Sequence, residues 1–385
     1  MGGVAKHTKG KRAKTIKALF SPEPTPEQIV HEIPKRKLKT LVHDTEQAAK
    51  AVNLIYVSDT DEGIRRIKQG TTFSYFLHKH KVKDPEILNR IKRLVIPPAW
   101  KNVWICIHED GHLQATGFDL KNRKQYRYHP LWNTLRNHTK FHRMIDFGRA
   151  LPGMRLQIEK DLAKHGLPLE KILAAIVSLM ERTNIRVGNS MYEKLYGSFG
   201  LTTLKDKHVA INGTQIKFSF KGKKGVNHNI SIRSKRLSDI VKKCRDIPGR
   251  ELFQYIDEKG NHHSIDSGMV NAYIKKISGT DFTTKDFRTW SGTLQAFMAF
   301  RDMGCCDNHS QIKKNIVKAL DCVSEHLGNT RTVCKKYYVH PVIITMYENK
   351  SLAKYFTALE KMEKDDDKSG LTPDEKLLLQ ILETS

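Results

Sequence analysis

The sequence lacks paired cysteines, long apolar runs and a secretory leader, and each absence excludes a class of protein. Its six cysteines form no CxxC pair, and no matching histidine cluster follows them: Cys106, Cys244, Cys305, Cys306, Cys322 and Cys334. A zinc site is therefore not predicted, and the irregular scatter is typical of reduced thiols in an intracellular protein. No apolar run is long enough to span a bilayer, and the polar, basic N-terminus lacks the apolar core of a secretory signal. We expect an intracellular protein without a membrane segment.

Acidic residues are scarce relative to basic ones. The 385 residues include 67 Lys and Arg against 41 Asp and Glu, which gives a formal net charge of +26. Lys and Arg recur along the whole chain, so no single tail accounts for the excess. A surface this basic attracts polyanions, of which nucleic acid is the commonest. The charge alone also fits a ribosomal or chromatin-type binder.

The length suits two domains with tails rather than one compact domain. Residues 1–48 begin with a lysine-rich stretch and continue into prolines, which predicts a basic flexible arm. Residues 49–130 contain β-branched and aromatic runs, so we expect a β-rich N-terminal domain with at least one helix. Residues 131–362 should form a larger, mainly α-helical domain, and residues 363–385 an acidic and polar tail.

Local patterns predict the elements of both domains. Strands are expected in the first domain at 54–58, 93–96, 103–107, 112–116 and 124–128. Apolar residues at helical spacing predict helices over 169–180, 267–277, 285–303 and 311–327, the last ended by Gly328. A hairpin of strands 209–220 and 226–232, with a basic, glycine-rich tip at 221–225, interrupts the helices. A short amphipathic helix is expected over 374–382, and the fold class is α+β.

Cleavage of a phosphodiester by a protein oxygen sets chemical requirements that can be compared with the sequence. The reaction needs a nucleophile, cations or N–H donors around the non-bridging oxygens, and an acid for the departing 5′ oxygen. Without a metal, Arg and Lys must supply the donors and the acid. Arg suits the phosphate because its planar fork binds two oxygens at once.

Cations marked by nearby glycines occur at two places in the second domain. Arg186, in Ile185-Arg186-Val187-Gly188-Asn189, follows a strongly apolar helix and needs an anion or a carboxylate partner. An ion pair with Glu181 or Glu193 is the ordinary alternative. Lys223 lies at the hairpin tip, where an exposed turn lysine is the ordinary alternative.

Two later segments add an arginine and a tyrosine. Arg288 lies near the start of a helix, three residues after Lys285, and a solvated helix terminus is the alternative. Gly328-Asn329-Thr330 follows a helix and by itself is typical of a helix stop and cap. Tyr338 lies in Lys335-Lys336-Tyr337-Tyr338-Val339, and a lone tyrosine is far more often packed than nucleophilic.

The order of these segments is more informative than any one of them. Arg186, Lys223 in a hairpin, K-x-x-R at 285–288, G-N-T at 328–330 and Tyr338, at 338 − 329 = 9 positions after the asparagine, closely resemble the catalytic domain of type IB DNA topoisomerases, in particular the small poxvirus-like and bacterial group. The first domain resembles the N-terminal β domain of that group in Val95-Ile96-Pro97-Pro98-Ala99-Trp100 and in Arg123-Lys124-Gln125-Tyr126-Arg127-Tyr128. The resemblance spans residues 53–350.

The resemblance implies a role for each site residue. Tyr338 would attack the scissile phosphate and form a DNA-(3′-phosphotyrosyl) intermediate. Lys223 would be the general acid for the 5′ oxygen, with Arg186 beside it, and Arg288 would hold the non-bridging oxygens. Asn329 stands where viral and nuclear relatives have a histidine and bacterial relatives have an asparagine. Asparagine can donate one hydrogen bond to a phosphate oxygen but carries no charge.

Five further residues match family positions that contact DNA. Lys285 and Tyr192 match contacts to the DNA backbone, and Gln125, Tyr126 and Tyr128 match a groove-reading segment. A strand face whose tyrosines pack is the alternative for the last three. The resemblance further implies a monomer that forms a clamp around double-stranded DNA and relaxes supercoils without ATP, metal or cofactor. Such an enzyme would work in the cytoplasm or nucleoid of a bacterium, or be associated with the virion of a virus.

Other functions fit part of the sequence. Tyrosine recombinases share the Arg–Lys–Arg–Tyr logic, but they usually have H-x-x-R where this chain has Lys285-x-x-Arg288, and a helical rather than β-rich N-terminal domain. A non-enzymatic DNA architectural protein would explain the charge but not the ordered motifs. A metal-dependent nuclease is not favoured, because the densest acidic run, Asp365-Asp366-Asp367, lies in a polar tail where charge runs are usually solvated.

Overall fold

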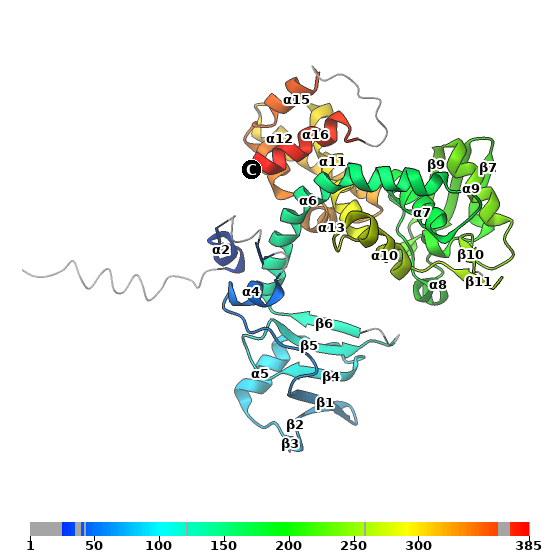
Figure 1. Ribbon diagram of the computed structural model, residues 1–385. Coiled ribbons are helices and arrows are strands. Elements are labelled where there is room, and N and C mark those ends of the chain that lie inside the picture. Colours follow the sequence, from blue (N-terminus) through cyan, green and yellow to red (C-terminus); the bar gives the residue numbers. More distant parts are fainter. Residues whose placement is uncertain are drawn as a thin grey trace, which may run out of the picture. The chain divides into compact units, whose positions relative to one another are not determined.

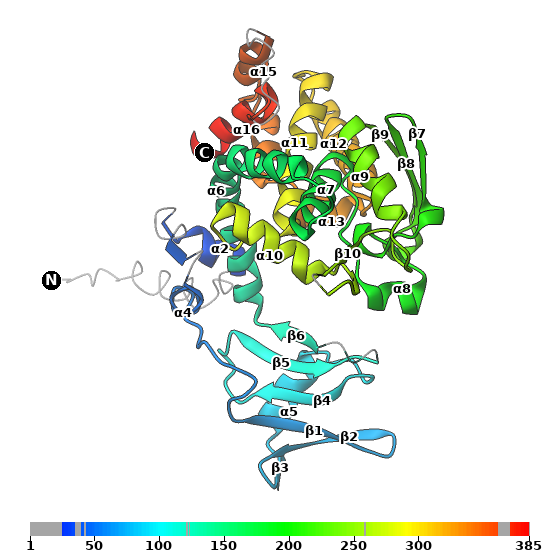
Figure 2. The ribbon, with the colours of Figure 1, turned by 45° about the vertical axis from the view of Figure 1, so that its right-hand side comes forward.

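The computed structural model describes residues 25–34, 40–41, 44–120, 122, 124–257, 259–360 and 370–384. Contacts divide the chain into two units between Arg143 and Met144, and each unit is described by itself (Figure 1, Figure 2). The first unit is built around a β-sheet and the second is mainly helical, which confirms the predicted α+β class. Within the described ranges, every helix is too short or too polar to cross a membrane.

The first unit contains an antiparallel sheet with a helix against one face. The strands follow the order β3-β2-β1-β4-β5-β6: β1 (Gly63–Gln69), β2 (Thr72–Leu77), β3 (His80–Lys81), β4 (Lys101–Cys106), β5 (Leu113–Phe118) and β6 (Lys124–Tyr128). Helix α5 (Pro85–Arg93) begins after its N-cap Asp84. Its Ile87 and Ile91 join a core cluster with Ile64 and Ile105 of the sheet, and Figure 2 shows α5 behind β4 and β5.

Three of the five strands predicted for this unit are confirmed and two are wrong. The runs at 103–107, 112–116 and 124–128 correspond to β4, β5 and β6. The run at 54–58 makes one isolated bridge, between Ile55 and Gly111, because the N–H groups of Val57 and Ser58 donate to side chains instead of to a strand. The run at 93–96 is the end of α5 and the loop after it, where Val95 has a φ of 48°.

Part of the segment predicted to be a flexible arm is folded. Residues 1–24 lie outside the described residues, but α2 (Pro26–His31) begins at a capping box of Thr25 and Gln28, and α4 (Thr45–Lys50) follows. Apolar side chains of this segment enter a core cluster, which contains Val30, Leu41, Ala48, Trp132 and Leu135. The average composition of residues 1–48 hid these few apolar positions, so we correct the arm prediction for residues 25–34 and 44–48.

A buried helix, α7 (Leu169–Thr183), forms the centre of the second unit. Its residues from Ile172 to Met180 are all buried. It packs against α9 (Lys235–Arg245), α10 (Ser267–Ser278) and α11 (Thr284–Met303). Helix α12 (His309–Leu327) packs against α11 and ends at Gly328, which has a φ of 57°. Helices α7, α10, α11 and α12 confirm the four helices predicted in this unit, and Gly328 ends α12 as predicted.

A three-stranded antiparallel sheet interrupts the helices of the second unit. It consists of β7 (Val209–Asn212), β8 (Gln215–Lys221) and β9 (Asn227–Arg233). The predicted strand at 209–220 is two strands, because Gly213, with a φ of 56°, turns the chain between β7 and β8. The predicted hairpin is formed by β8 and β9, and a short turn at Lys223–Gly225 makes its tip. A second, smaller hairpin joins β10 (Gln254–Ile256) to β11 (His262–Ser264).

Four helices follow α12 in the described part of the second unit: α13 (Arg331–Tyr337), α14 (Pro341–Glu348), α15 (Ala353–Glu360) and α16 (Pro373–Thr384). Helix α16 packs against α11 and α15 and buries Leu377, Leu378 and Ile381. The helix predicted over 374–382 is therefore present, whereas the acidic run of the predicted tail lies outside the described residues.

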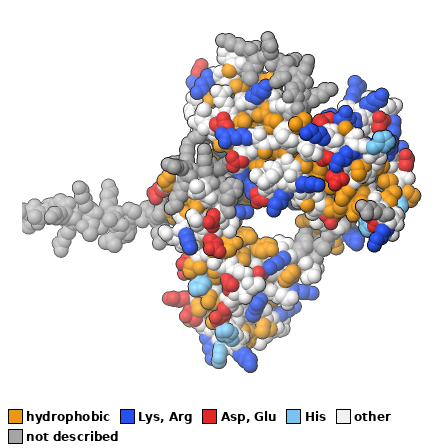
Figure 3. All heavy atoms as spheres, in the orientation of Figure 1, with side chains coloured by type: hydrophobic (Ala, Val, Ile, Leu, Met, Phe, Trp, Pro, Cys, Tyr) orange, Lys and Arg blue, Asp and Glu red, His pale blue; other side chains and the backbone are white. Residues whose placement is uncertain are grey.

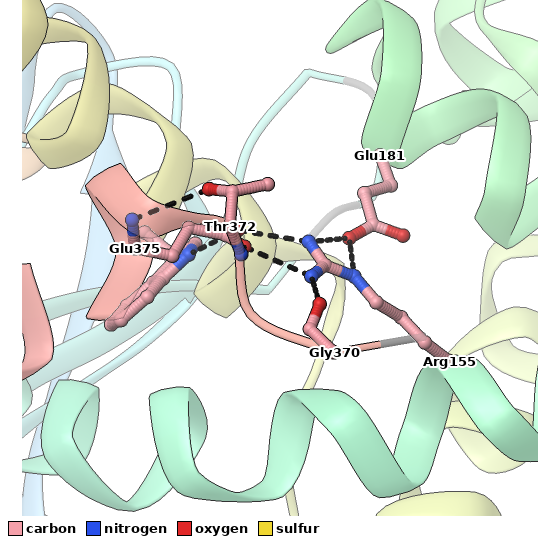
Figure 4. A network of polar contacts seen from close by, with 6 residues as sticks. Arg155, Glu181, Gly370, Thr372 and Glu375 are labelled. Carbon is pink, nitrogen blue, oxygen red and sulfur yellow. Dashed lines mark hydrogen bonds and ion pairs between the residues drawn. The ribbon is translucent and has the colours of Figure 1, made fainter. Parts of the chain in front are cut away.

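A buried polar network joins α16 to the core of the unit (Figure 4). Arg155, from the long helix α6 (Pro130–Ala163), donates to both carboxylate oxygens of Glu375 and to Glu181 of α7. The indole N–H of Trp290, on α11, donates to Glu375 at 3.1 Å. We therefore correct the tail prediction for residues 373–384, which belong to the packed core.

Candidate active site

A pocket in the second unit brings together side chains that the sequence presents far apart. Its walls include Arg186, Lys223, Arg288 and Tyr338, together with Tyr192 and Lys285. They come from the loop after α7, the tip of the β8–β9 hairpin, the first turns of α11, the end of α13, and α8 (Ser190–Tyr196). Segments up to 338 − 186 = 152 positions apart therefore meet at one place.

Backbone carbonyls orient Arg288 within the pocket. Its Nη1 donates to the carbonyl oxygen of Asn184 at 2.6 Å and its Nη2 to that of Leu327 at 2.7 Å. Asn184 ends α7 in the left-handed region, with a φ of 53°, and its side-chain nitrogen lies 2.8 Å from Nε2 of His326. The last carbonyls of a helix have no intrahelical partner and carry partial negative charge, so the ends of α7 and α12 attract and hold the guanidinium.

The same end of α12 orients Arg186. Its Nη2 donates to the carbonyl oxygen of Gly328 at 3.0 Å and to Oδ1 of Asn329 at 2.7 Å. The predicted site residue Asn329 thus lies beside Arg186. Gly328 both ends α12 and supplies a carbonyl oxygen that accepts from Arg186. Because Leu327 and Gly328 are consecutive, one turn of backbone holds both arginines of the pocket.

Carboxylates near Arg186 in the sequence have other partners. Glu181 forms an ion pair with Arg155 and Glu193 forms one with Lys205, each with an N–O distance of 2.7 Å. The alternative that Arg186 pairs with either glutamate is therefore wrong. Among the described residues, no carboxylate forms an ion pair with Arg186, Lys223 or Arg288. The pocket can therefore accept an anion.

Two buried donors at the site have no hydrogen-bond partner in the part of the chain that the structure describes. They are Nε of Arg288 and Nδ2 of Asn329. A buried donor without a partner costs about 1–3 kcal/mol. The guanidinium carbon of Arg288 lies 5.4 Å from the centre of the Tyr338 ring. A ligand with several acceptor oxygens beside Tyr338 would give such donors partners.

The cations make one another harder to charge. Burial and the charge of Arg288 lower the pKa of Arg186 to about 10. Burial and the charge of Arg186 lower the pKa of Lys223. Burial also lowers the pKa of Arg288, against the opposing effect of Tyr338. An anion in the pocket would favour the charged forms and so raise these pKa values again.

Contacts with α11 and α13 fix the backbone of Tyr338. The hydroxyl of Thr293 donates to the carbonyl oxygen of Tyr338 at 3.0 Å, and the N–H of Tyr338 donates to the carbonyl of Cys334 at 2.9 Å. A Cβ placed on Gly292 would lie 2.9 Å from the carbonyl oxygen of Tyr338 and 3.1 Å from its Cβ. A larger residue at position 292 would therefore push Tyr338 out of place.

The turn that carries Lys223 is closed by backbone hydrogen bonds. The N–H of Gly222 donates to the carbonyl of Val226 at 2.7 Å, and Lys224 adopts a φ of 61°. The ammonium of Lys223 lies 5.8 Å from the centre of the Tyr192 ring. Lys223 is exposed, as the alternative of a turn lysine expects, but its ammonium also lines the pocket beside Tyr192 of α8.

The three DNA-contact residues predicted in the first unit all lie on β6. Tyr126 and Tyr128 are 47% and 38% exposed and stack on each other, with ring centres 5.9 Å apart. They are therefore at the surface rather than packed in the core. Gln125 alternates with them along the strand and donates to Asp119 at 3.1 Å. Tyr56, which is 44% exposed and stacks on His112, is an aromatic surface residue that the sequence analysis missed.

Several residues that support the pocket were also missed. Asn184 and Leu327 act through backbone carbonyls, Gly292 acts by being small, and His228 of β9 lies next to Gly328. Asn184 and Arg288 are 104 positions apart, so no local pattern links them. The one available signal was an asparagine at the end of a strongly apolar helix, which is typical of a left-handed C-cap.

Basic side chains are also spread over the surface outside the pocket. Figure 3 shows Lys and Arg on the visible face of both units, interspersed with Asp and Glu. The pocket places four cations and two tyrosines together, and none of these cations forms an ion pair with a carboxylate among the described residues. Such a site is suited to an anion with several acceptor oxygens, such as a phosphate ester.

Comparison with known families agrees with this class. Residues 125–365 match the family model described as the catalytic core of eukaryotic DNA topoisomerase I. Residues 72–119 match the model described as the N-terminal domain of bacterial DNA topoisomerase IB. The bacterial N-terminal model matches residues of the first unit alone. The core model matches the second unit and also β6 and the start of α6 in the first unit.

Individual relatives are viral enzymes. The chain is 34% identical over 297 residues to the DNA topoisomerase 1B of Acanthamoeba polyphaga mimivirus. This alignment covers 75% of this chain and 88% of the relative. It is 25% identical over 237 residues to the DNA topoisomerase 1B of vaccinia virus (strain Copenhagen), in an alignment that covers 61% of this chain and 72% of the relative. The chain therefore belongs to the type IB DNA topoisomerase family and is an enzyme of the isomerase class.

Proposed function

We propose that this chain relaxes supercoiled double-stranded DNA by transient cleavage of one strand, through a covalent 3′-phosphotyrosyl intermediate and without ATP or metal. The observation that carries the proposal is the convergence of Arg186, Lys223, Arg288 and Tyr338 on one pocket. Such a pocket supplies positive charge and N–H donors where negative charge develops on a phosphorus under attack. Membership of the type IB topoisomerase family supports the same reaction.

The proposed cycle uses side chains of the pocket in both directions. The hydroxyl oxygen of Tyr338 attacks the phosphorus, an O–P bond forms, and the phenolic proton leaves to solvent. The bond between phosphorus and the 5′ oxygen breaks while Lys223, assisted by Arg186, gives that oxygen a proton. Arg288 and Asn329 donate to the non-bridging oxygens. The products are a 3′-phosphotyrosine and a free 5′ hydroxyl.

Resealing is the reverse reaction. A phosphotyrosine ester is close in energy to the phosphodiester that it replaces, so the 5′ hydroxyl can attack back without ATP. Between the two steps the free end rotates and superhelical strain is released. The lowered pKa of Lys223 suits this role, because an acid closer to neutral pH gives up its proton more easily.

We further propose that a single copy of the chain binds the duplex with both units. Residues 49–130 would form the DNA-binding N-terminal domain, and residues 131–362 the catalytic domain. Lys285 and Tyr192 would contact the DNA backbone beside the pocket, while Gln125, Tyr126 and Tyr128 of the first unit would contact a groove. Most contacts would be to phosphates, so binding should weaken steeply as salt increases. The enzyme would work wherever the DNA of its host cell or virion lies.

A plasmid relaxation assay tests the proposal. Purified protein is mixed with negatively supercoiled plasmid in EDTA without ATP, and we expect a ladder of relaxed topoisomers. Tyr338→Phe should give none, whereas Tyr337→Phe, at the neighbouring tyrosine, should relax the plasmid normally. A requirement for Mg²⁺ or ATP would refute the metal-free, ATP-free cycle. Exchange of strands between paired specific sites would instead identify a recombinase, and binding without relaxation an architectural protein.

A further inference from the structure

The ring of His228 lies between the turn that contains Gly222 and Lys223 and the turn that contains Gly328 and Asn329. His228 is half-buried on β9, and its ring stacks on Phe220 of β8, with ring centres 4.9 Å apart and planes inclined by 21°. A Cβ placed on Gly222 would lie 2.6 Å from Cδ2 and Nε2 of the ring, and one placed on Gly328 would lie 3.1 Å from Cε1. The imidazole therefore occupies space that is free only because neither glycine has a Cβ.

These two contacts connect parts of the site that have different roles. Gly222 directly precedes Lys223, the proposed general acid. Gly328 supplies the carbonyl that orients Arg186 and directly precedes Asn329. The imidazole thus fills the space between the turn that carries the acid and the turn that holds its neighbouring cation. A change in the ring should change the distance between the two turns.

The ring makes its contacts by packing rather than by hydrogen bonding. Neither of its nitrogens has a hydrogen-bond partner among the described residues. Burial, with the charges of Arg186 and Arg288, lowers the pKa of His228. A neutral ring is therefore favoured, and a neutral ring does not repel the nearby arginines.

We propose that His228 is a positioning residue whose ring holds the Lys223 turn against the Gly328–Asn329 turn, so that the ammonium of Lys223 reaches the leaving 5′ oxygen. This inference rests on the proposed cleavage reaction. It assigns no proton or phosphate contact to His228 itself. Its effect on cleavage therefore passes through Lys223.

Single-turnover cleavage of a DNA duplex tests this dependence. We expect His228→Ala to slow cleavage roughly 10-fold to 100-fold, as expected when a catalytic group is displaced by about 1 Å, with DNA affinity unchanged. His228→Phe, which keeps a ring of similar shape, should cleave almost as fast as the wild type. His228→Ala should have no further effect in the Lys223→Ala background, because coupled residues are not additive. Multiplying effects, or equal damage from Phe and Ala, would overturn the proposal.

A chemically altered substrate gives a second readout. DNA with sulfur in place of the 5′ bridging oxygen has a thiolate leaving group, which departs more easily than an alkoxide and needs no general acid. The rate of His228→Ala on this DNA should return to the wild-type rate on the same DNA. A rate that stays low would mean that the variant damages more than acid catalysis, and the proposal would fall.

Control variants separate loss of fold from loss of position. His262→Ala changes an exposed histidine of β11 and should leave cleavage unchanged. If His228→Ala does not fold, Gly222→Ala replaces it, because the added Cβ would displace the ring; this variant should show the same slow cleavage and the same recovery with sulfur. If the wild type forms no covalent adduct, the proposed function fails; if it does and the His228 variants match it, only the positioning role fails.

Discussion

Replacement of Arg288 by lysine should keep the charge of the pocket but remove most of its cleavage activity. Arg288 is 5% exposed, and two of its N–H groups are taken by the carbonyls of Asn184 and Leu327. Its Nε, which has no partner among the described residues, is the donor left for a phosphate oxygen. One compact ammonium cannot replace this fork of donors. Loss of a donor to the developing charge typically slows a reaction about 10²–10³-fold, or about 2.7–4 kcal/mol.

The assay is single-turnover formation of the covalent adduct on a duplex nicked just beyond the cleavage site, so that the short released strand cannot be resealed. Arg301→Lys is the matched control, because Arg301 lies on the same helix, about 20 Å further along it, and pairs with Asp374. Urea unfolding should show a loss of about 1–3 kcal/mol for Arg288→Lys, since one carbonyl is left without a donor. A folded Arg288→Lys protein that cleaves at the wild-type rate would refute the reasoning.

Three further predictions concern the acid, the nucleophile and the core. The second-order rate constant of cleavage, measured with DNA below saturation so that it reports the free enzyme, should fall as pH rises through the lowered pKa of Lys223, because only the ammonium donates a proton; a rate constant that stays unchanged up to the ordinary lysine pKa of about 10.4 would contradict this. Gly292→Ala should slow cleavage, since its Cβ would lie 2.9 Å from the carbonyl oxygen of Tyr338; an unchanged rate would show that the tyrosine tolerates displacement. Glu375→Gln should lower the free energy of unfolding at neutral pH by about 3 kcal/mol, because Arg155 loses a buried partner. Burial raises the pKa of Glu375, but hydrogen bonding and charge from Arg155 outweigh it and lower the pKa overall. Urea unfolding should therefore show this difference shrinking as pH falls from the ordinary glutamate pKa of about 4.3 through the lowered pKa.

The sequence predicted elements that have strong local signals. The helix at 311–327 and its stop at Gly328 were predictable because an apolar spacing ends at a glycine, and the structure has that glycine in the left-handed region. The hairpin around Lys223 was predictable from two β-branched runs and a glycine-rich tip. Strand 54–58 was wrong because its N–H groups bond to side chains whose positions depend on the fold. Strands β1 and β2, whose residues are mixed in polarity, were not predicted at all.

The candidate site shows the same division. Arg186, Lys223, Arg288 and Tyr338 could be selected from the order of their motifs, and the structure places all four on one pocket. What orients them could not be selected, because those contacts are made by backbone atoms, small residues and a packed ring. A carbonyl is present at every position, so nothing in the sequence distinguishes that of Leu327 from any other. The C-terminal helix was underestimated for a related reason, since the partner that buries Glu375 is Arg155, 220 positions away.

Peptide mapping of the trapped adduct tests the central claim most directly. The protein is denatured during cleavage of a radiolabelled or mass-tagged duplex, digested with protease, and the peptide that carries the nucleotide is sequenced by mass spectrometry. We predict a nucleotide joined through its 3′ phosphate to the hydroxyl of Tyr338, with a free 5′ hydroxyl on the released strand. A 5′ linkage, a different modified residue, or cleaved DNA without a covalent peptide would contradict it.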